Sequence, residues 1–298
     1  DSAFFDKRSK FLHYFPRILT LGRVEFDHAD IFNSLDEILL SFRRLINLLP
    51  DNGCLIYDAS SEHTRALAAA ARCRKWSVGF EDACDWRLGS SGNHHLLTTP
   101  DRKQLDFRIP QPGLHNRLNA LMALASASAV RENTQAYLEA LASFQGIRRR
   151  LEKLFENESF VVFDDFAHHP TAVRAAILAM RESYPQHRII AVFEPRSNTS
   201  VRNIHSSEFT DSFAVADEVV VGSIHRLERI PANQRLDTNR IIGELRSRIS
   251  SAVHLENSEI IEYLLSRIDS HPTAFLFMSN GSFDSVPATF VDRLQASL

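Results

Sequence analysis

Two carboxylates and two imidazoles lie close together in the middle of the chain, at Asp164, Asp165, His168 and His169. They follow residues 160–163, a short unbroken apolar run with β-branched residues, which is typical of a strand covered on both faces. Such a strand delivers the four side chains at its C-terminal end, where ligands bind in open α/β sheets. The alternative is a capped turn, in which one aspartate accepts backbone N–H groups and the histidines are solvated. For a single acid we would favour the capped turn, but for this motif on a buried strand we favour a functional site, because sites cluster at strand ends.

Three potential metal ligands, Asp27, His28 and Asp30, fall within four residues after an apolar segment at 18–21. Their side chains include carboxylate oxygens and an imidazole nitrogen, which are common metal donors. Their spacing alone is weak evidence, because Asp-x-x-Asp before a helix is more often a cap.

A third polar group opens a strongly periodic segment at 114–130 and consists of His115, Asn116 and Asn119. Residues three and four apart are neighbours on a helix, so the three side chains cluster at one helix end. An asparagine amide carries both a donor and an acceptor and can match the N6/N7 edge of adenine. Helix capping would explain Asn116 better than Asn119, because Asn is disfavoured inside a helix.

Three consecutive arginines, Arg148, Arg149 and Arg150, stand between a helical segment and the strand that carries the two aspartates. A lone charge run is usually a solvated linker. Its position here predicts the joint between two domains, residues 1–147 and 148–298. Arginines at such a joint could bind the phosphates of a ligand.

Strand-like and helical segments alternate along both halves of the chain, which predicts an α/β protein with mostly parallel sheets. In the first half we expect strands at 18–21, 54–57 and 76–80, short antiparallel strands between 82 and 108, and helices at 35–49, 63–74, 114–130 and 134–144. In the second half we expect strands at 160–163, 188–193, 218–221 and 274–278, with helices near 173–180, 209–216 and 260–268. These four strands predict a Rossmann-like sheet with Asp165, Arg196 and Asn280 along one edge. No G-x-G-x-x-G motif follows a strand, which argues against a dinucleotide hydride carrier.

The composition fits an ordinary globular protein of two domains. Of its 298 residues, 44% are hydrophobic and 24% are charged. A formal net charge of −3 gives no basic field for nucleic acid, and no apolar run approaches the roughly 20 residues of a membrane span. Three cysteines without C-x-x-C spacing predict free thiols in a reducing cytoplasm. Because the chain begins at Asp1 rather than at Met, we expect further residues to precede it.

The order of four segments is more informative than any one of them: residues 26–30, 115–120, 146–152 and 164–170. In this order the chain resembles the Mur ligases of peptidoglycan synthesis over nearly its whole length. Residues 3–11 and 194–199 resemble the family member that attaches a whole peptide during murein recycling more than the member that attaches L-alanine.

The resemblance implies a central ATPase domain followed by a C-terminal Rossmann-like domain, and it implies ATP and Mg²⁺ as cofactors. His28 matches a residue that helps to hold Mg²⁺, and Asp165 matches a carboxylate that binds the ribose; these two are the implied catalytic residues. The other implied nucleotide contacts are His115, Asn116, Asn119, Arg150 and His168. The implied contacts of the incoming peptide are Arg196, Ser197 and Asn198.

The implied reaction is ATP-dependent amide formation in the cytoplasm. The lactyl carboxylate of UDP-N-acetylmuramate attacks the γ-phosphoryl group to give an acyl phosphate, and the amine of L-Ala-γ-D-Glu-meso-diaminopimelate then displaces phosphate. The family's G-x-x-G-K-[ST] phosphate loop and UDP-binding domain do not occur in the sequence, so we expect the chain to begin inside the central domain. For that reason we do not expect residues 1–298 alone to turn over ATP. Residues 278–284 match the family's closing loop only in part, so Asn280 and Asp284 receive no role.

Three other hypotheses are compatible with parts of this pattern. The first is a UDP-N-acetylmuramate–L-alanine ligase, and the second is a non-catalytic nucleotide-binding module, which the missing phosphate loop would favour. A zinc hydrolase using Asp164, Asp165, His168 and His169 has suitable ligands but lacks an H-E-x-x-H motif, which disfavours it.

Overall fold

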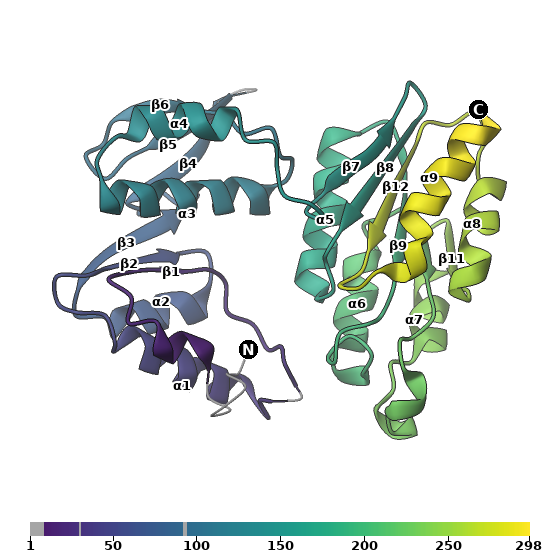
Figure 1. Cartoon of the computed structure of the whole chain (residues 1–298), viewed down its shortest axis with the longest axis horizontal. Coiled ribbons are helices and arrows are strands. Elements are labelled where there is room, and N and C mark those ends of the chain that lie inside the picture. The colour runs from purple at the N-terminus through teal and green to yellow at the C-terminus, as the bar shows by residue number, and fades with distance from the viewer. Residues whose placement is uncertain (1–8, 30, 92–93) are drawn as a thin grey trace. The chain divides into compact units, whose positions relative to one another are not determined.

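The computed structural model describes residues 9–29, 31–91 and 94–298, which form two compact units (Figure 1). The N-terminal unit consists of Asp1–Gln111 and His115–Gln145. The C-terminal unit consists of Pro112–Leu114 and Gly146–Leu298. Each unit contains one six-stranded sheet.

The sheet of the N-terminal unit has its strands in chain order: β1 (Ile18–Leu21), β2 (Cys54–Asp58), β3 (Arg74–Gly79), β4 (Trp86–Ser91), β5 (His94–Thr98) and β6 (Gln104–Phe107). The first four strands are parallel, and β5 and β6 are antiparallel to their neighbours. The predicted parallel alternation and the antiparallel strands after residue 82 are therefore confirmed. One detail differs, because β4 joins the sheet parallel to β3.

Helices cover both faces of this sheet. Residues of α1 (Leu35–Ile46) and α2 (Glu62–Ala69) share one buried cluster with Leu55 of β2. Residues of α3 (Leu114–Val130) and α4 (Thr134–Ala142) share another with Ile56. Since adjacent strand residues point to opposite faces, the two helix pairs lie on opposite sides of the sheet, as Figure 1 shows. The predicted helix at 63–74 was too long, because the chain leaves α2 at Ala69 and Arg74 already pairs with Cys54.

The sheet of the C-terminal unit has the strand order β11 (Ser251–His254), β10 (Glu218–Val221), β9 (Arg188–Phe193), β12 (Thr273–Met278), β8 (Phe160–Asp165) and β7 (Glu152–Glu156). All neighbours are parallel except β7, which is antiparallel to β8. The four predicted strands are the four central ones. They are confirmed, and their burial on both faces explains why they read as continuous apolar runs.

Three layers make up the C-terminal unit. On one face lie α5 (Pro170–Ser183), α6 (Ser206–Phe213) and α7 (Thr238–Leu245), and on the other lie α8 (Asn257–Ser266) and α9 (Val286–Ser297) (Figure 1). Short 3-10 helices occur at Lys10–His13, Asn203–His205, Leu227–Arg229, Ala232–Gln234 and Phe283–Ser285. The sequence did not predict α7, α9 or the two edge strands.

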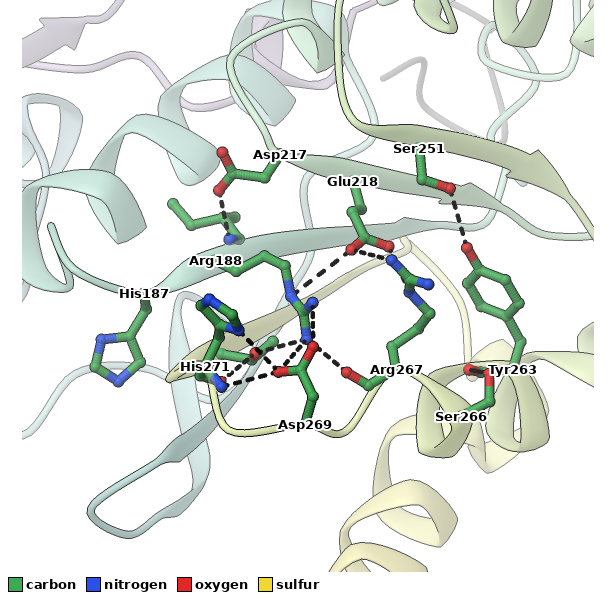
Figure 2. A network of polar contacts seen from close by, with 12 residues as sticks. His187, Arg188, Asp217, Glu218, Ser251, Tyr263, Ser266, Arg267, Asp269 and His271 are labelled. Atoms are coloured by element: carbon green, nitrogen blue, oxygen red, sulfur yellow. Dashed lines mark hydrogen bonds and ion pairs between the residues drawn. The ribbon is translucent and has the colours of Figure 1, made fainter.

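A closed ion network joins the amino ends of the central strands (Figure 2). The buried carboxylate of Glu218 accepts two hydrogen bonds from Arg267, at 2.9 and 2.7 Å, and lies 3.6 Å from Nε of Arg188. Arg188 also pairs with Asp269 at 3.0 Å and donates to Thr273 at 3.1 Å. Each charged side chain of this network has a partner of opposite charge. We therefore assign the network a structural role at this end of the sheet.

Candidate active site

The carboxyl ends of β8, β9 and β12 lie side by side in the C-terminal unit. Met278, the last residue of β12, is in register with Asp165 on one side and with Phe193 on the other. The next amides continue this pairing, since Ser279 N donates to the Asp165 carbonyl at 3.1 Å and Glu194 N donates to the Met278 carbonyl at 3.0 Å. The sequence prediction that Asp165, Arg196 and Asn280 follow neighbouring strands along one edge is confirmed.

Asp165 is almost fully buried, and both of its carboxylate oxygens accept backbone hydrogen bonds. Oδ2 accepts from the Leu151 amide and Oδ1 from the Ala167 amide, each at 2.7 Å. Burial raises the pKa of Asp165, while these two bonds and the nearby arginines oppose the rise. The capped-turn interpretation therefore describes part of what this residue does. A carboxylate has about four acceptor positions, so two remain for other donors.

Asp165 holds a strained loop that leads into β7. Arg149 and Leu151 both have left-handed backbone conformations, with φ of 57° and 48°. Such conformations cost non-glycine residues about 1 kcal/mol or more, and they persist only where surrounding contacts impose them. Those contacts are the Asp165 bond to the Leu151 amide and a bond of 2.8 Å from the Arg149 amide to Glu152 Oε2.

The side chain of Arg149 connects this loop to the ends of two strands. Its Nε donates to Asp164 Oδ2 at 3.2 Å, and its Nη2 donates to the carbonyl of Ser279. Its guanidinium also lies 5.3 Å from the centre of the Phe166 ring. Burial raises the pKa of Asp164 to about 6, despite the opposing effect of Arg149, and the neighbouring Glu152 and Asp165 raise it further.

Arg150 differs from Arg149 in being exposed. Its guanidinium lies 5.4 Å from the centre of the Phe166 ring. In the part of the chain that the structure describes, its side chain makes no hydrogen bond or ion pair, so the charge is available to an anion. The sequence analysis assigned the nucleotide contact to the exposed Arg150. It gave no role to Arg149, whose side chain binds Asp164 and the Ser279 carbonyl.

The two histidines of the motif point to different neighbours. His168 Nδ1 lies 3.0 Å from the Phe166 carbonyl, and its ring meets the Phe166 ring edge-to-face at 5.5 Å. The His169 ring instead contacts His205, with ring centres 5.0 Å apart. Within residues 9–29, 31–91 and 94–298, no three His, Cys, Asp or Glu side chains are arranged to hold a metal ion. The zinc hydrolase hypothesis therefore has no support in this structure.

The loop after β9 is held by two serines. Ser200 Oγ accepts from the amides of Arg196 and Ser197, at 3.1 and 2.9 Å, and lies 2.8 Å from the Ser197 hydroxyl. Asn198 is exposed, and its carbonyl accepts a bond of 3.2 Å from Arg202. Of the three predicted peptide contacts, Ser197 has its hydroxyl bound within the loop, Arg196 is half-buried and Asn198 is exposed.

The loop after β12 lies against the Arg196 side chain. Arg196 Nη1 is 3.3 Å from Oε1 of the buried Glu194, whose Oε2 accepts from the Ser279 hydroxyl. Ser279 Oγ in turn accepts the amide of Gly281 at 2.9 Å. The sequence did not single out Glu194 or Ser279 as site residues.

Two other predicted groups lie in the N-terminal unit. His28 is exposed on the loop after β1, with φ of 56°, and its amide donates to Asp27 Oδ1 at 2.7 Å. Asp30 lies outside the described residues. In the first turns of α3, His115 and Asn116 are half-buried and Asn119 is exposed. This helix is tied to β1 by a contact of 2.6 Å between the hydroxyls of Thr20 and Ser126.

Two family models match successive parts of the chain. The Mur ligase middle domain matches residues 6–127, and the glutamate ligase domain of Mur ligases matches residues 149–281. The chain belongs to the Mur ligase family. The fold expected from the resemblance, two mostly parallel α/β sheets, is confirmed.

The relatives of this Mur ligase chain include proteins named UDP-N-acetylmuramate–L-alanyl-γ-D-glutamyl-meso-2,6-diaminoheptandioate ligase. One from Haemophilus influenzae is 32% identical over 99% of this chain, and one from Escherichia coli is 39% identical over 74%. A crystal structure of a murein peptide ligase from Psychrobacter arcticus covers 99% of this chain with a TM-score of 0.70 and 30% identity. A UDP-N-acetylmuramate–L-alanine ligase from Desulfitobacterium hafniense is 27% identical over 95% of the chain.

The chain spans only part of these Mur ligases. It covers 64% and 49% of the lengths of the first two relatives and 61% of the crystallised chain. Within the part of the sequence that the structure describes, no helix is long and apolar enough to cross a membrane. Cys54, Cys73 and Cys84 are buried free thiols.

A further buried carboxylate in this Mur ligase chain was missed because its neighbours are ordinary turn residues. Asp58 ends β2, and its Oδ1 accepts from the amide and the hydroxyl of Ser60, at 2.8 and 2.6 Å. These bonds close the turn into α2, so Asp58 has a structural role. The feature of the sequence that could have indicated Asp58 is its position as an acid at the end of a predicted strand.

Proposed function

We propose that this chain belongs to an ATP-dependent amide ligase of peptidoglycan recycling. The enzyme would join UDP-N-acetylmuramate to L-Ala-γ-D-Glu-meso-diaminopimelate through an acyl phosphate. The observation that carries the proposal is the match to relatives named for this reaction, one of them over 99% of the chain. Residues 1–147 would be the C-terminal part of the central ATPase domain, and residues 148–298 would be the ligase domain.

Candidate nucleotide contacts occur in each of the two units. In the C-terminal unit, the two remaining acceptor positions of Asp165 suit ribose hydroxyls, and the exposed guanidinium of Arg150 suits a phosphate. His168 would lie beside the nucleotide. In the N-terminal unit, Asn116 and Asn119, together with His115, offer donors and acceptors for adenine. ATP supplies the phosphoryl group that activates the sugar's carboxylate.

Mg²⁺ would be held by His28 in the N-terminal unit, together with phosphate oxygens and water. Magnesium typically takes only one or two protein ligands and keeps several waters, so a dense protein cluster is not required. The exposed position of His28 fits this kind of site. The ion would neutralise charge on the phosphates during phosphoryl transfer.

The peptide would be bound at the loop after β9. The guanidinium of Arg196 suits a carboxylate of the acceptor, because its planar fork can donate two parallel hydrogen bonds. Asn198 is exposed beside it and offers a polar side chain to the peptide, whereas the hydroxyl of Ser197 is paired with Ser200. We also propose that the enzyme works in the cytoplasm, where its thiols would stay reduced.

An acceptor assay tests the proposal. The complete protein that contains residues 1–298 is incubated with UDP-N-acetylmuramate, ATP and Mg²⁺, and with either the free tripeptide or L-alanine. We expect an amide product with the tripeptide and little with L-alanine. No product with either acceptor would refute the ligase assignment. We also expect residues 1–298 alone to show no ATP turnover, because the sequence contains no G-K-[ST] loop.

The second candidate is a UDP-N-acetylmuramate–L-alanine ligase. The observation that favours it is the match to relatives of that name over 95% of the chain. A product with L-alanine and none with the tripeptide would establish this candidate in place of the first.

A further inference from the structure

Glu194 is one of the most deeply buried acids of the C-terminal unit, with 2% of its surface exposed. It follows β9 directly, and its amide continues the pairing of β9 with β12. Both carboxylate oxygens are used: Oε1 lies 3.3 Å from Arg196 Nη1, and Oε2 accepts from the Ser279 hydroxyl. A buried carboxylate is costly without partners, so its side chain has little freedom to move.

Ser279 connects the Glu194 carboxylate to the loop after β12. Its hydroxyl donates to Glu194 and accepts the amide of Gly281 at 2.9 Å. Its carbonyl accepts from Arg149. The single residue therefore sets the path of the loop on which the Arg196 side chain lies.

Gly281 shows how close the contact between that loop and Arg196 is. A Cβ atom at residue 281 would stand 2.0 Å from both Cδ and Nε of Arg196 and 2.5 Å from Cζ. The backbone of Gly281 does not have a positive φ, so an alanine would meet no strain except this overlap. The guanidinium of Arg196 is thus paired with the Glu194 carboxylate, and the Arg196 side chain packs closely against the bare backbone of Gly281.

We propose that Glu194 is a positioning residue, which acts with Ser279 and Gly281 to fix the Arg196 guanidinium in the pose that receives a carboxylate of the acceptor peptide. The proposal rests on the function proposed above, in which Arg196 contacts the peptide. It adds that the affinity for the acceptor depends on a buried acid and a glycine that do not touch the peptide themselves.

Two substitutions displace Arg196 without removing it. Glu194→Gln keeps the size of the side chain but removes the charge that holds the guanidinium. Gly281→Ala pushes the guanidinium aside and leaves Glu194 intact. We expect each to raise the KM for the tripeptide about tenfold, which corresponds to about 1.4 kcal/mol, while the KM for ATP and for UDP-N-acetylmuramate changes less than about twofold.

A double-mutant cycle separates positioning from general damage to the fold. If Gly281→Ala acts only through Arg196, it has no further effect on the tripeptide KM once Arg196→Ala is present. The matched control is Glu218→Gln at the amino edge, where another buried carboxylate is held by two arginines. We expect this control to lower the unfolding temperature and to leave the tripeptide KM unchanged.

The measurements use the complete protein and steady-state ligation with each substrate varied in turn. Raised tripeptide KM values in Glu194→Gln and Gly281→Ala, with no added effect in the double variant, would support the proposal. If both variants retain the wild-type tripeptide KM while Arg196→Ala raises it, positioning by Glu194 is refuted and the proposed function stands. A wild-type protein that ligates no peptide would refute the proposed function and this inference with it.

Discussion

The two ends of the sheet in the C-terminal unit have opposite physical characters. At the amino ends, the buried Glu218, the half-buried Arg188 and Arg267, and the exposed Asp269 form a network of ion pairs (Figure 2). At the carboxyl ends, Asp164 carries a pKa raised to about 6 and Arg150 has no ionic partner in the described part of the chain. At the amino ends each of these four charges has an ionic partner within the chain, whereas at the carboxyl ends the exposed Arg150 could pair with an anionic ligand.

The backbone shows the same contrast. Nine non-glycine residues have positive φ in the described part of the chain, and six of them lie in loops at the carboxyl edge of this sheet: Arg149, Leu151, Arg226, Phe283, Asp284 and Ser285. None of the nine lies in the connections that lead into the amino ends, at 157–159, 184–187, 214–217, 246–250 and 267–272. Strain of this kind persists only where surrounding contacts impose it, and it often occurs at functional sites. These positive φ values are concentrated at the edge where we propose that ligands bind.

The largest effect on stability should come from opening the amino-edge network. Arg267→Ala leaves the Glu218 carboxylate buried with only the more distant Arg188, so we expect the free energy of unfolding to fall by about 3 kcal/mol. The control is Arg293→Ala, because Arg293 and Glu262 form an exposed pair that contributes less than about 1 kcal/mol. Urea unfolding followed by circular dichroism measures both. Equal losses of unfolding free energy in the two variants would contradict our claim that the amino-edge network stabilises the fold more than an exposed ion pair does.

The next largest effect is a pH dependence of stability that arises from Asp164 at the carboxyl edge. The folded state raises the pKa of Asp164 from 3.8 to about 6, so it favours the protonated acid. The contribution of Asp164 to stability is therefore fully present below about pH 4 and is lost as the pH rises through 6. We expect the stability of the wild type relative to Asp164→Asn to increase by up to about 3 kcal/mol between pH 7 and pH 4. A difference that stays constant over this range would contradict the raised pKa that burial gives to Asp164.

A smaller effect should separate two neighbouring arginines at the same edge. Arg150→Ala should raise the KM for ATP about tenfold in the complete protein, because a hydrogen bond to a charged group contributes about 1.5 kcal/mol or more. Unfolding should be unaffected, since in the described part of the chain this exposed side chain makes no ion pair and lies against the Phe166 ring. Arg148→Ala, another exposed arginine, is the control and should leave both quantities unchanged. An equal rise of the KM for ATP in the two variants would show that the loss of any positive charge in this region is sufficient, and would contradict a specific role of Arg150.

The smallest effect tests the backbone strain itself. Ser285 is exposed with φ of 62° and makes no side-chain cap bond at the start of α9, so Ser285→Gly should stabilise the protein by about 0.5 kcal/mol. Ser250 is an exposed serine at the amino edge without a positive φ, and Ser250→Gly should destabilise by a similar amount. Thermal unfolding compares the two. The same sign for both substitutions would show that the carboxyl edge stores no strain at this position.

The sequence predicted the central strands because burial on both faces leaves a direct trace, an unbroken apolar run such as residues 189–193. It did not predict β7 and β11, whose residues are mostly half-buried or exposed and leave no such trace. The short helix α7 was also missed, although α2 and α6, which have the same length of eight residues, were predicted.

The sequence could predict those parts of the candidate site whose position follows from a residue's place after a strand. Asp165 and Arg196 follow recognisable strands, so their place along one edge could be inferred. The different roles of Arg149 and Arg150 could not, because they depend on the left-handed turn at Arg149. Asn257 donates to Asp284 at 2.7 Å, a contact between residues 27 positions apart that only the folded chain creates.

The central claim, amide ligation through an acyl phosphate, is tested most directly by an isotope experiment. UDP-N-acetylmuramate labelled with ¹⁸O in both oxygens of its lactyl carboxylate is supplied to the complete protein with ATP, Mg²⁺ and the tripeptide. The account predicts one ¹⁸O atom in each phosphate released, together with one amide product, because the carboxylate oxygen that attacks phosphorus leaves with it. Phosphate released without the label would contradict the account.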